Sequence, residues 1–313
     1  MNLNLNLNEN VKTKVLLVGH GSRFKAGNDE IDTFVNIWRE KNPQWKIEAC
    51  FIEFSDVLLD RGLDNAAEGA ERVIVVPLIL NAAGHVKMEI PHFINDARQR
   101  HPEVEFIYAR HLGAGEPILN ILKRNLVKVM MAMDAPDPKS TGVILLGRGS
   151  SDRVANGEIA KMARWLFEES DHELVDIAFT GITYPRLEMA VQRHVQQGMT
   201  QIAILPYYLF TGTLIERIKR QVERLKVQYP QVIFAHGEYF GFEEEIYAML
   251  NERVLDASGD VNDAETRMME CDGCLYRQEA EADHHHHHHH DDAHNHDHNH
   301  DHNNEQEAEK AGA

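Results

Sequence analysis

The chain has 313 residues, of which 43% are hydrophobic and 26% charged, and its formal net charge is −18. These values suit a globular protein with room for two modest domains or one large one. They argue against a membrane-spanning helix, because no apolar run approaches the roughly 20 residues that cross a bilayer, and against a duplex-binding surface, which needs clustered Lys and Arg. The start, MNLNLNLNEN, has neither region of a secretion signal, and three cysteines cannot build a disulfide framework. We therefore expect a cytoplasmic protein without a nucleic-acid or membrane partner.

The charge and the histidines are distributed unevenly. Residues 256–313 include 16 acidic and 3 basic side chains, a net charge of −13, so the first 255 residues carry only −5. Of the 20 histidines, 12 lie between His284 and His302. The body of the protein is therefore nearly neutral, and most of the acidity belongs to a tail.

Short β-branched runs alternate with helical patterns along the body. The predicted strands include Val15 to Val18, Val73 to Leu80, Val143 to Leu146 and Ile202 to Leu205, and the predicted helices include Ile31 to Lys41 and Leu187 to Gln197. Continuous apolar runs of this kind are typical of strands buried on both faces of a parallel sheet. The alternation predicts an α/β fold with mainly parallel sheets covered by helices.

Two sequence motifs recur at almost the same offset. LVGHGS precedes LLGRGS by 128 residues, and VVPLIL precedes ILPYYL by 129. This indicates an internal duplication with two similar α/β domains, at 11–134 and 142–256, joined by a Pro-rich linker at 135–141. The first ten residues are expected to be disordered.

The segment 257–313 cannot bury enough apolar surface to order itself, so we expect it to be disordered as well. Seven consecutive histidines are followed by alternating His, Asn and Asp, which favours a native metal-binding tail over a purification tag. Such ligands suit Co²⁺ or Ni²⁺ without selecting between them. Cys271 and Cys274 form a CxxC pair that could grip one metal or one edge of an iron–sulfur cluster, with further ligands from the tail histidines, another chain or a small thiol. A redox dithiol or an unremarkable exposed pair is the alternative.

Two histidines follow predicted strands, at the place where ligand sites of open α/β sheets lie. His20 comes directly after VLLVG, and His85 comes after VIVVPLILNAAG. We expect the two to meet at one cleft, where Glu53, at a third strand end, would complete an imidazole and carboxylate cluster for a divalent metal. The simpler alternative is that His20 caps a helix and His85 is a surface loop residue.

The duplication provides an internal control. The second-half residues that match His20, Glu53 and His85 are Arg148, Ile182 and Leu214. Residues that served only packing or capping should be retained about equally in both halves. The joint loss of all three polar groups therefore favours a single site built by the first half.

Other chemistries fit these residues less well. The segment GHGSR lacks the spacing of known nucleotide-binding loops. A nucleophilic histidine beside an arginine, as in phosphohistidine enzymes, stays open as a second interpretation. Cys50 lies in an apolar strand and is expected in the core rather than as a nucleophile.

Together these motifs resemble a known family. A duplicated α/β body with GHGSR and NAAGHVKMEIP, and a tail that combines a His-rich tract with MMECDGC, is similar to the long form of the CbiX class II chelatases, from Lys14 to about Arg277. The resemblance implies a chelatase-like fold of two similar α/β domains around a cleft, and insertion of a divalent metal into sirohydrochlorin on the way to cobalamin. It also implies that His20 and His85 bind the metal and are catalytic, with Glu53 as an acidic neighbour. An iron–sulfur centre is implied at the motif of Met268, Cys271 and Cys274, with the two cysteines as ligands.

The residue types suit this chemistry. Neutral imidazoles can hold Co²⁺ or Fe²⁺ while leaving coordination positions open, and a histidine or Glu53 can accept the two pyrrole protons that insertion releases. Sirohydrochlorin carries eight carboxylates, so the cleft should be locally basic. Arg23, Lys25 and Lys87 are the candidate substrate-binding cations, with solvated surface charge as the alternative for each.

The leading hypothesis is an ATP-independent sirohydrochlorin cobaltochelatase. The alternatives are a sirohydrochlorin ferrochelatase for sirohaem, a metal-storage or metallochaperone protein, and a phosphohistidine-type hydrolase. Imidazole ligands suit cobalt and iron alike. We further expect the tail to store or deliver metal while chelation survives its removal, and a dimer through a shared cluster is one arrangement that would supply the missing cluster ligands.

Overall fold

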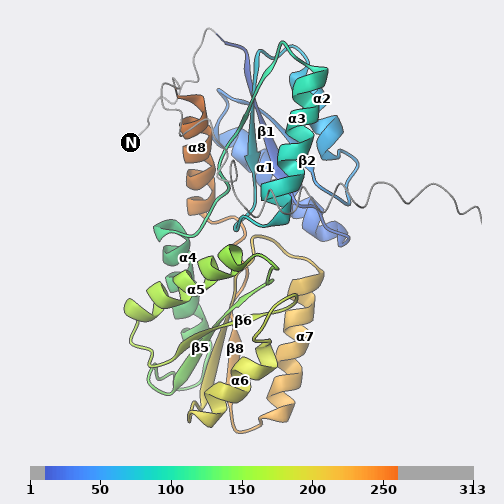
Figure 1. Cartoon of the computed structure of the whole chain (residues 1–313). Coiled ribbons are helices and arrows are strands. Elements are labelled where there is room, and N and C mark those ends of the chain that lie inside the picture. The colour runs from blue at the N-terminus through green and yellow to red at the C-terminus, as the bar shows by residue number, and fades with distance from the viewer. Residues whose placement is uncertain (1–10, 260–313) are drawn as a thin grey trace, which may run out of the picture.

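The computed structural model describes residues 11–259 (Figure 1). The predicted disorder of 1–10 and nearly all of the predicted tail, including Cys271, Cys274 and the histidine run, lie outside the described residues. The strands are β1 (Thr13–Gly19), β2 (Lys46–Phe51), β3 (Arg72–Pro77), β4 (Glu105–Tyr108), β5 (Thr141–Gly147), β6 (Val175–Phe179), β7 (Gln201–Pro206) and β8 (Ile233–His236). The helices are α1 (Lys25–Lys41), α2 (Leu59–Ala67), α3 (Ile90–Arg100), α4 (Glu116–Met131), α5 (Arg153–Glu168), α6 (Leu187–Gln196), α7 (Thr213–Gln228) and α8 (Glu244–Ser258), and a π-helical turn, η1 (His85–Glu89), precedes α3.

Each half of the chain forms a four-stranded sheet in which all neighbouring strands are parallel. The strand orders are β2-β1-β3-β4 and β6-β5-β7-β8. The register is repeated as well, since Val18 pairs with both Cys50 and Pro77, while Leu146 pairs with both Ala178 and Pro206. The predicted α/β class with duplicated parallel sheets is confirmed.

The strand order creates a switch point in each sheet. The chain leaves β1, forms β2 on one side, and then crosses to place β3 on the other side of β1. The carboxyl ends of β1 and β3 are therefore adjacent, and loops leaving them diverge around a crevice, which is where ligands bind in such sheets.

The final helix of each half packs on the sheet of the other half. Helix α8 lies against β3 of the first sheet, whereas α4 lies against β7 and β8 of the second sheet (Figure 1). One hydrophobic core consequently contains buried residues of both halves, for example Leu17, Ile118, Leu145 and Leu250. Two further cores, one for each half, fill the outer faces of the sheets. Because apolar burial is shared across the junction, the halves are expected to unfold together.

The structure extends one predicted boundary and confirms one predicted core residue. Helix α8 continues to Ser258, two residues past the predicted boundary, because Ala257 is still buried in the shared core. Cys50 is buried, and burial raises the pKa of its thiol, so its predicted place in the core is confirmed.

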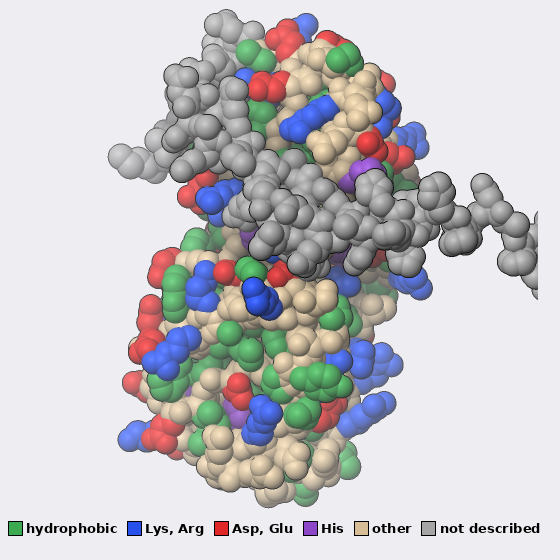
Figure 2. All heavy atoms as spheres, in the orientation of Figure 1, with side chains coloured by type: hydrophobic (Ala, Val, Ile, Leu, Met, Phe, Trp, Pro, Cys, Tyr) green, Lys and Arg blue, Asp and Glu red, His purple; other side chains and the backbone are tan. Residues whose placement is uncertain are grey.

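The surface is mixed in charge. Figure 2 shows Lys and Arg side chains intermingled with Asp and Glu over both lobes of the visible face, as a nearly neutral body would require. Between residues 11 and 259, none of the helices is both long and apolar enough to cross a bilayer.

Candidate functional site

His20 is the first residue after β1 and is held there by a tight turn. Gly21 has a φ of +87°, and a Cβ atom at this position would overlap the carbonyl oxygen of Glu53, so the turn requires glycine. The amide of Ser22 donates to Asn28 Oδ1 at 2.9 Å, which ties the loop to the first turns of α1. The loop thus fixes the His20 backbone at the carboxyl end of β1.

His85 begins the π-helical turn η1, which leads into α3. The N–H of Ile90 reaches back five residues to the His85 carbonyl. Pro91 has no N–H with which to continue this pattern, and the Val86 carbonyl accepts a hydrogen bond from the Tyr108 hydroxyl at 3.1 Å instead. Isolated π turns are frequent at functional sites.

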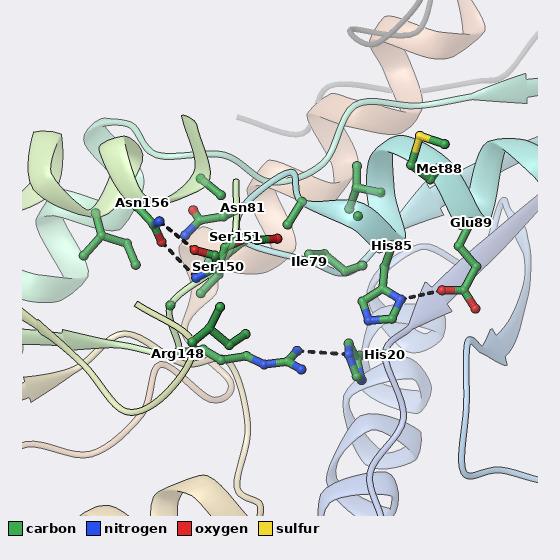
Figure 3. A pocket seen from close by; sticks show the side chains of 18 of the residues that line it. His20, Ile79, Asn81, His85, Met88, Glu89, Arg148, Ser150, Ser151 and Asn156 are labelled. Atoms are coloured by element: carbon green, nitrogen blue, oxygen red, sulfur yellow. Dashed lines mark hydrogen bonds and ion pairs between the residues drawn. The ribbon is translucent and has the colours of Figure 1, made fainter. Parts of the chain in front are cut away.

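The structure brings His20 and His85 together. Their ring centroids are 4.6 Å apart with an interplanar angle of 83°, and both residues line a cavity of about 1040 Å³ between the two halves (Figure 3). The simpler alternatives do not hold, because α1 has Phe24 as its N-cap and His85 lies in a helical turn rather than a loop. The predicted meeting of the two histidines at one cleft is therefore seen, while their role as metal ligands stays a prediction.

Hydrogen bonds fix the orientation of both imidazoles. His20 Nδ1 lies 3.0 Å from the carbonyl oxygen of Gly21, and His85 Nδ1 lies 2.5 Å from Glu89 Oε2. A carboxylate behind a histidine in this way fixes the ring and increases its basicity as a ligand. In both rings the bond uses Nδ1 and leaves Nε2 as the second nitrogen.

Burial dominates the electrostatics of His20. It lowers the pKa of this imidazole below 6.5, and the positive charges that His85 and Arg148 can carry act in the same direction. The Gly21 carbonyl and Glu53 oppose this shift. His20 is therefore neutral at pH 7, with a lone pair available to a ligand.

Glu53 lies behind His20 rather than in the cavity wall. Its Oε1 is 3.5 Å from His20 Nδ1, an ion-pair distance longer than a good hydrogen bond, and Glu53 is not among the residues that line the cavity. Within residues 11–259, no group of three or more His, Cys, Asp or Glu side chains is arranged to hold a metal ion. The predicted cluster of His20, His85 and Glu53 is thus not preassembled into a closed ligand set. A metal that must be passed on needs open positions of this kind.

The three predicted substrate-binding cations lie outside the cavity lining. Arg23 stacks over the Phe54 ring at 4.7 Å, and the exposed Lys25 pairs with Asp29 at 2.9 Å. Lys87 Nζ lies 2.5 Å from Asp152 Oδ2, and both side chains are largely buried, so this pair bridges the two halves. Binding of substrate by these cations stays a prediction.

One of the internal matches moves by one residue in the structure. The amide of Glu53 bonds to the His20 carbonyl, and the corresponding bond to the Arg148 carbonyl comes from Gly181. Ile182 instead corresponds to Phe54, since both have a positive φ, 61° and 55°. The asymmetry between the halves remains, because the second-half residue that corresponds to Glu53 is Gly181 instead of Ile182, and neither residue is acidic.

Sequence reasoning missed several residues of the site. Glu89 could have been found from its spacing of four residues from His85, which places both on one helical face. Arg148 was identified only as the counterpart of His20, yet its Nη1 donates to His20 Nε2 at 3.2 Å across the cavity (Figure 3). The apolar wall includes Ile79, Leu80, Val86, Met88 and Phe93 of the first half and Ala155, Ile159 and Ile182 of the second. The buried Asn81 Oδ1 and Tyr207 hydroxyl also belong to lining residues, and neither atom has a hydrogen-bond partner in the described part of the chain.

The arrangement can hold a large molecule that packs an apolar face on the cavity wall and has its reactive centre beside two imidazoles. A cavity of this volume exceeds what a single ion or small metabolite needs, and its mixture of apolar wall and few polar groups is typical of ligand sites.

Comparison with known proteins places the chain in a family. The CbiX family model matches residues 14–129 and again 142–257. The chain is 39% identical over 267 residues to a sirohydrochlorin cobaltochelatase of Priestia megaterium, covering 84% of each protein. It is 31% identical to a sirohydrochlorin ferrochelatase of the same species, covering 77% of this chain and 88% of the relative. The structure of SirB from Bacillus subtilis with Fe³⁺ superposes with a TM-score of 0.69 at 28% identity, covering 79% of this chain and 96% of SirB, so the expected chelatase-like fold is confirmed. The chain belongs to the CbiX family.

Proposed function

We propose that this protein is a sirohydrochlorin chelatase that inserts a divalent metal without ATP, with Co²⁺ as its main metal substrate. The observation that carries the proposal is the facing pair of imidazoles, 4.6 Å apart, beside a cavity of about 1040 Å³. The higher identity to a cobaltochelatase, 39% against 31% for a ferrochelatase, supports cobalt over iron.

His20 and His85 are assigned to hold the incoming metal through their Nε2 atoms. Both Nδ1 atoms face oxygen partners, the Gly21 carbonyl and Glu89, which leaves Nε2 for the metal. Burial lowers the pKa of His20 and keeps its ring neutral, so protons do not compete for its lone pair at pH 7. Two imidazoles hold a borderline metal firmly enough to orient it and leave positions for pyrrole nitrogens.

The apolar wall is assigned to the macrocycle. A porphyrinoid plane buries apolar area against side chains such as Ile79, Val86 and Ile182, while its carboxylates require cations or solvent. Insertion releases two protons from pyrrole nitrogens. Glu53 is half-exposed, close to His20 Nδ1 and outside the cavity lining, so it is assigned to receive these protons through water and not from the pyrrole nitrogens directly.

The tail is assigned a supporting role. We retain an iron–sulfur cluster at Cys271 and Cys274, and binding of Co²⁺ or Ni²⁺ by the histidine run, as proposals that concern segments outside the described residues. A chain that ends after Gly259 keeps all of α8 and is expected to retain chelatase activity. Loss of activity in such a chain, with its fold intact, would move part of the site into the tail.

The decisive experiment compares metals and histidine variants on the full-length protein. Sirohydrochlorin is incubated anaerobically with Co²⁺ and with Fe²⁺, and metal insertion is followed by visible absorption. We expect faster turnover with Co²⁺, and a loss of roughly a hundredfold or more in His20→Ala and in His85→Ala. His236→Ala is the matched control, because His236 is the last residue of β8 as His20 is the first after β1, has its Nδ1 3.2 Å from the following carbonyl oxygen, and does not line the cavity. Full activity in both site variants would refute the assignment, and faster turnover with Fe²⁺ would make the protein a ferrochelatase.

A further inference from the structure

Arg148 of the second half occupies the nitrogen of His20 that the metal needs. Its Nη1 lies 3.2 Å from His20 Nε2. A guanidinium has no acceptor, so Arg148 must donate and Nε2 must accept with its lone pair. His20 then carries its proton on Nδ1 and donates to the Gly21 carbonyl at 3.0 Å, which agrees with the geometry seen.

This contact and metal binding exclude each other. A metal ion at Nε2 would use the same lone pair, and it would meet a fixed positive charge at close range. Only movement of the Arg148 side chain can therefore open the site. Arg148 is exposed, which makes such movement easy.

A carboxylate of the tetrapyrrole can compete with His20 for the Arg148 guanidinium. Among the described residues that line the cavity, Arg148 alone has a fixed positive charge, and no carboxylate of residues 11–259 forms an ion pair with it. Guanidinium groups bind carboxylates in a bidentate geometry that a neutral imidazole nitrogen cannot match. Sirohydrochlorin brings eight carboxylates into this cavity.

We propose that Arg148 is a displaceable cap on His20, which a carboxylate of the tetrapyrrole displaces, so that the metal binds His20 more tightly once the tetrapyrrole has entered. The inference rests on the proposed chelatase function and adds to it a coupling between tetrapyrrole binding and metal binding. It also accounts for the difference between His20 in the first half and Arg148 at the matching position of the second. The loop that presents a metal ligand in the first half presents, in the second half, a cation aimed at that ligand from across the cleft.

The buried pair of Lys87 and Asp152 holds the two sides of the cleft at this spacing. Lys87 is two residues after His85, and Asp152 is four residues after Arg148. Their contact of 2.5 Å therefore links the segments that carry the histidine and its cap. Movement of Arg148 alone, without separation of the halves, is enough to open His20.

The test uses the full-length protein and two substitutions of Arg148. Arg148→Met keeps much of the side-chain length without charge or donor, and Arg148→Lys keeps the charge and a donor. Co²⁺ binding without tetrapyrrole is measured by equilibrium dialysis for each protein with and without His20→Ala, so that the difference removes binding by the tail. Sirohydrochlorin binding without metal is measured separately from its absorption change.

The two affinities are expected to change in opposite directions. In Arg148→Met, the His20-dependent Kd for Co²⁺ should fall about tenfold, while the Kd for sirohydrochlorin should rise by a similar factor. Arg148→Lys keeps the charge but loses the bidentate geometry, so both Kd values should lie between those of the unsubstituted protein and those of Arg148→Met. Unchanged or weaker Co²⁺ binding in Arg148→Met would overturn the inference. Weaker binding of both Co²⁺ and sirohydrochlorin would show that Arg148 has a structural role instead. If the unsubstituted protein neither inserts metal nor binds it through His20 when sirohydrochlorin is present, the proposed function itself fails.

Discussion

The two halves of the molecule share one backbone frame but differ in the side chains that the frame presents. In the first half, the amide of Ser22 is held by Asn28 at 2.9 Å, and in the second half Ser150 is held by Asn156 at the same distance. The preceding glycine has a φ of +87° in one half and +86° in the other. The duplicated parts are therefore those that shape the turn after the central strand.

The residue before each of these glycines decides what the turn does. The first half presents the imidazole of His20, and the second half presents the guanidinium of Arg148, which bonds to that imidazole. One fold thus presents an imidazole and an opposing charge from equivalent positions. The residues that shape the turn are therefore shared by the two halves, whereas the side chain that the turn presents to the cleft differs between them.

The largest effect is expected when the first half is given the second half's residue. His20→Arg removes the lone pair assigned to the metal and adds a second cation facing Arg148. Turnover should fall roughly a thousandfold, equivalent to about 4 kcal/mol of transition-state stabilisation, while the free energy of unfolding changes by less than about 1 kcal/mol. The checks are kcat/KM for sirohydrochlorin with Co²⁺ and unfolding in urea.

His101→Arg is a control for the added charge. His101 follows α3, at the end away from the site, and its pairing with Asp64 can be kept by arginine. This variant should keep activity within threefold. If His20→Arg does the same, the first half holds no essential ligand at this position, and the contrast between the halves loses its functional meaning.

The glycines should behave alike in the two halves. A Cβ atom at Gly21 would overlap the Glu53 carbonyl oxygen, and one at Gly149 would overlap the Gly181 carbonyl oxygen, both at a positive φ. Gly21→Ala and Gly149→Ala should each lower the free energy of unfolding by about 3 kcal/mol. Urea denaturation of the two variants measures this directly. A loss of stability in only one of the two variants would mean that only one half needs glycine in the turn after its central strand.

Another difference between the halves lies in the core. His194 of α6 is fully buried, neither of its ring nitrogens has a hydrogen-bond partner in the described residues, and its counterpart in α2 is the buried Ala66. Burial lowers the pKa of His194 to about 4. Since the unfolded chain has a histidine pKa near 6.5, protonation favours unfolding, and the stability present above pH 6.5 is lost as the pH falls towards 4.

This predicts a stability loss that a leucine would remove. Between pH 7.5 and pH 5, His194 should lower the free energy of unfolding by about 2 kcal/mol, and His194→Leu should lack that contribution. The measurement is urea unfolding of both proteins at the two pH values. An identical pH dependence of the free energy of unfolding in the two proteins would show that protonation of His194 does not cause the loss of stability at acid pH.

The elements of the fold were predictable where the pattern was local. Apolar runs such as Val15 to Val18 identify buried strands, because both faces of a parallel sheet are covered by helices. His20 and His85 could be placed in one cleft because both follow strands whose carboxyl ends meet at one edge. The exchange of α4 and α8 between the sheets was not predictable, since each helix has an apolar face that would fit either sheet.

The rest of the site depends on the directions in which side chains point, and these cannot be predicted from how close the residues are in the sequence. Lys87 is two residues from His85, yet it turns to Asp152 of the other half. Arg148 is 128 residues from His20 and touches it. A local window around each histidine therefore finds cations that lie outside the cavity lining, and only the packing of one half on the other brings in Arg148.

The smallest effect is expected from the cations that the first half carries on its surface. Arg23 stacks on Phe54, and Lys25 is paired with Asp29 in solvent. If they attract the carboxylates of sirohydrochlorin, they do so over a distance and through water, so their contribution is screened by salt. The double variant Arg23→Ala and Lys25→Ala should raise KM for sirohydrochlorin two- to threefold at about 50 mM salt and less at about 300 mM, with kcat unchanged. An increase above tenfold at both salt concentrations would mean that these side chains hold the substrate directly, and the first half would then supply both the metal ligands and the substrate cations. No change at low salt would mean that Arg148 attracts the carboxylates without help from Arg23 and Lys25. The imidazoles would then come from the first half and the substrate-binding cation from the second.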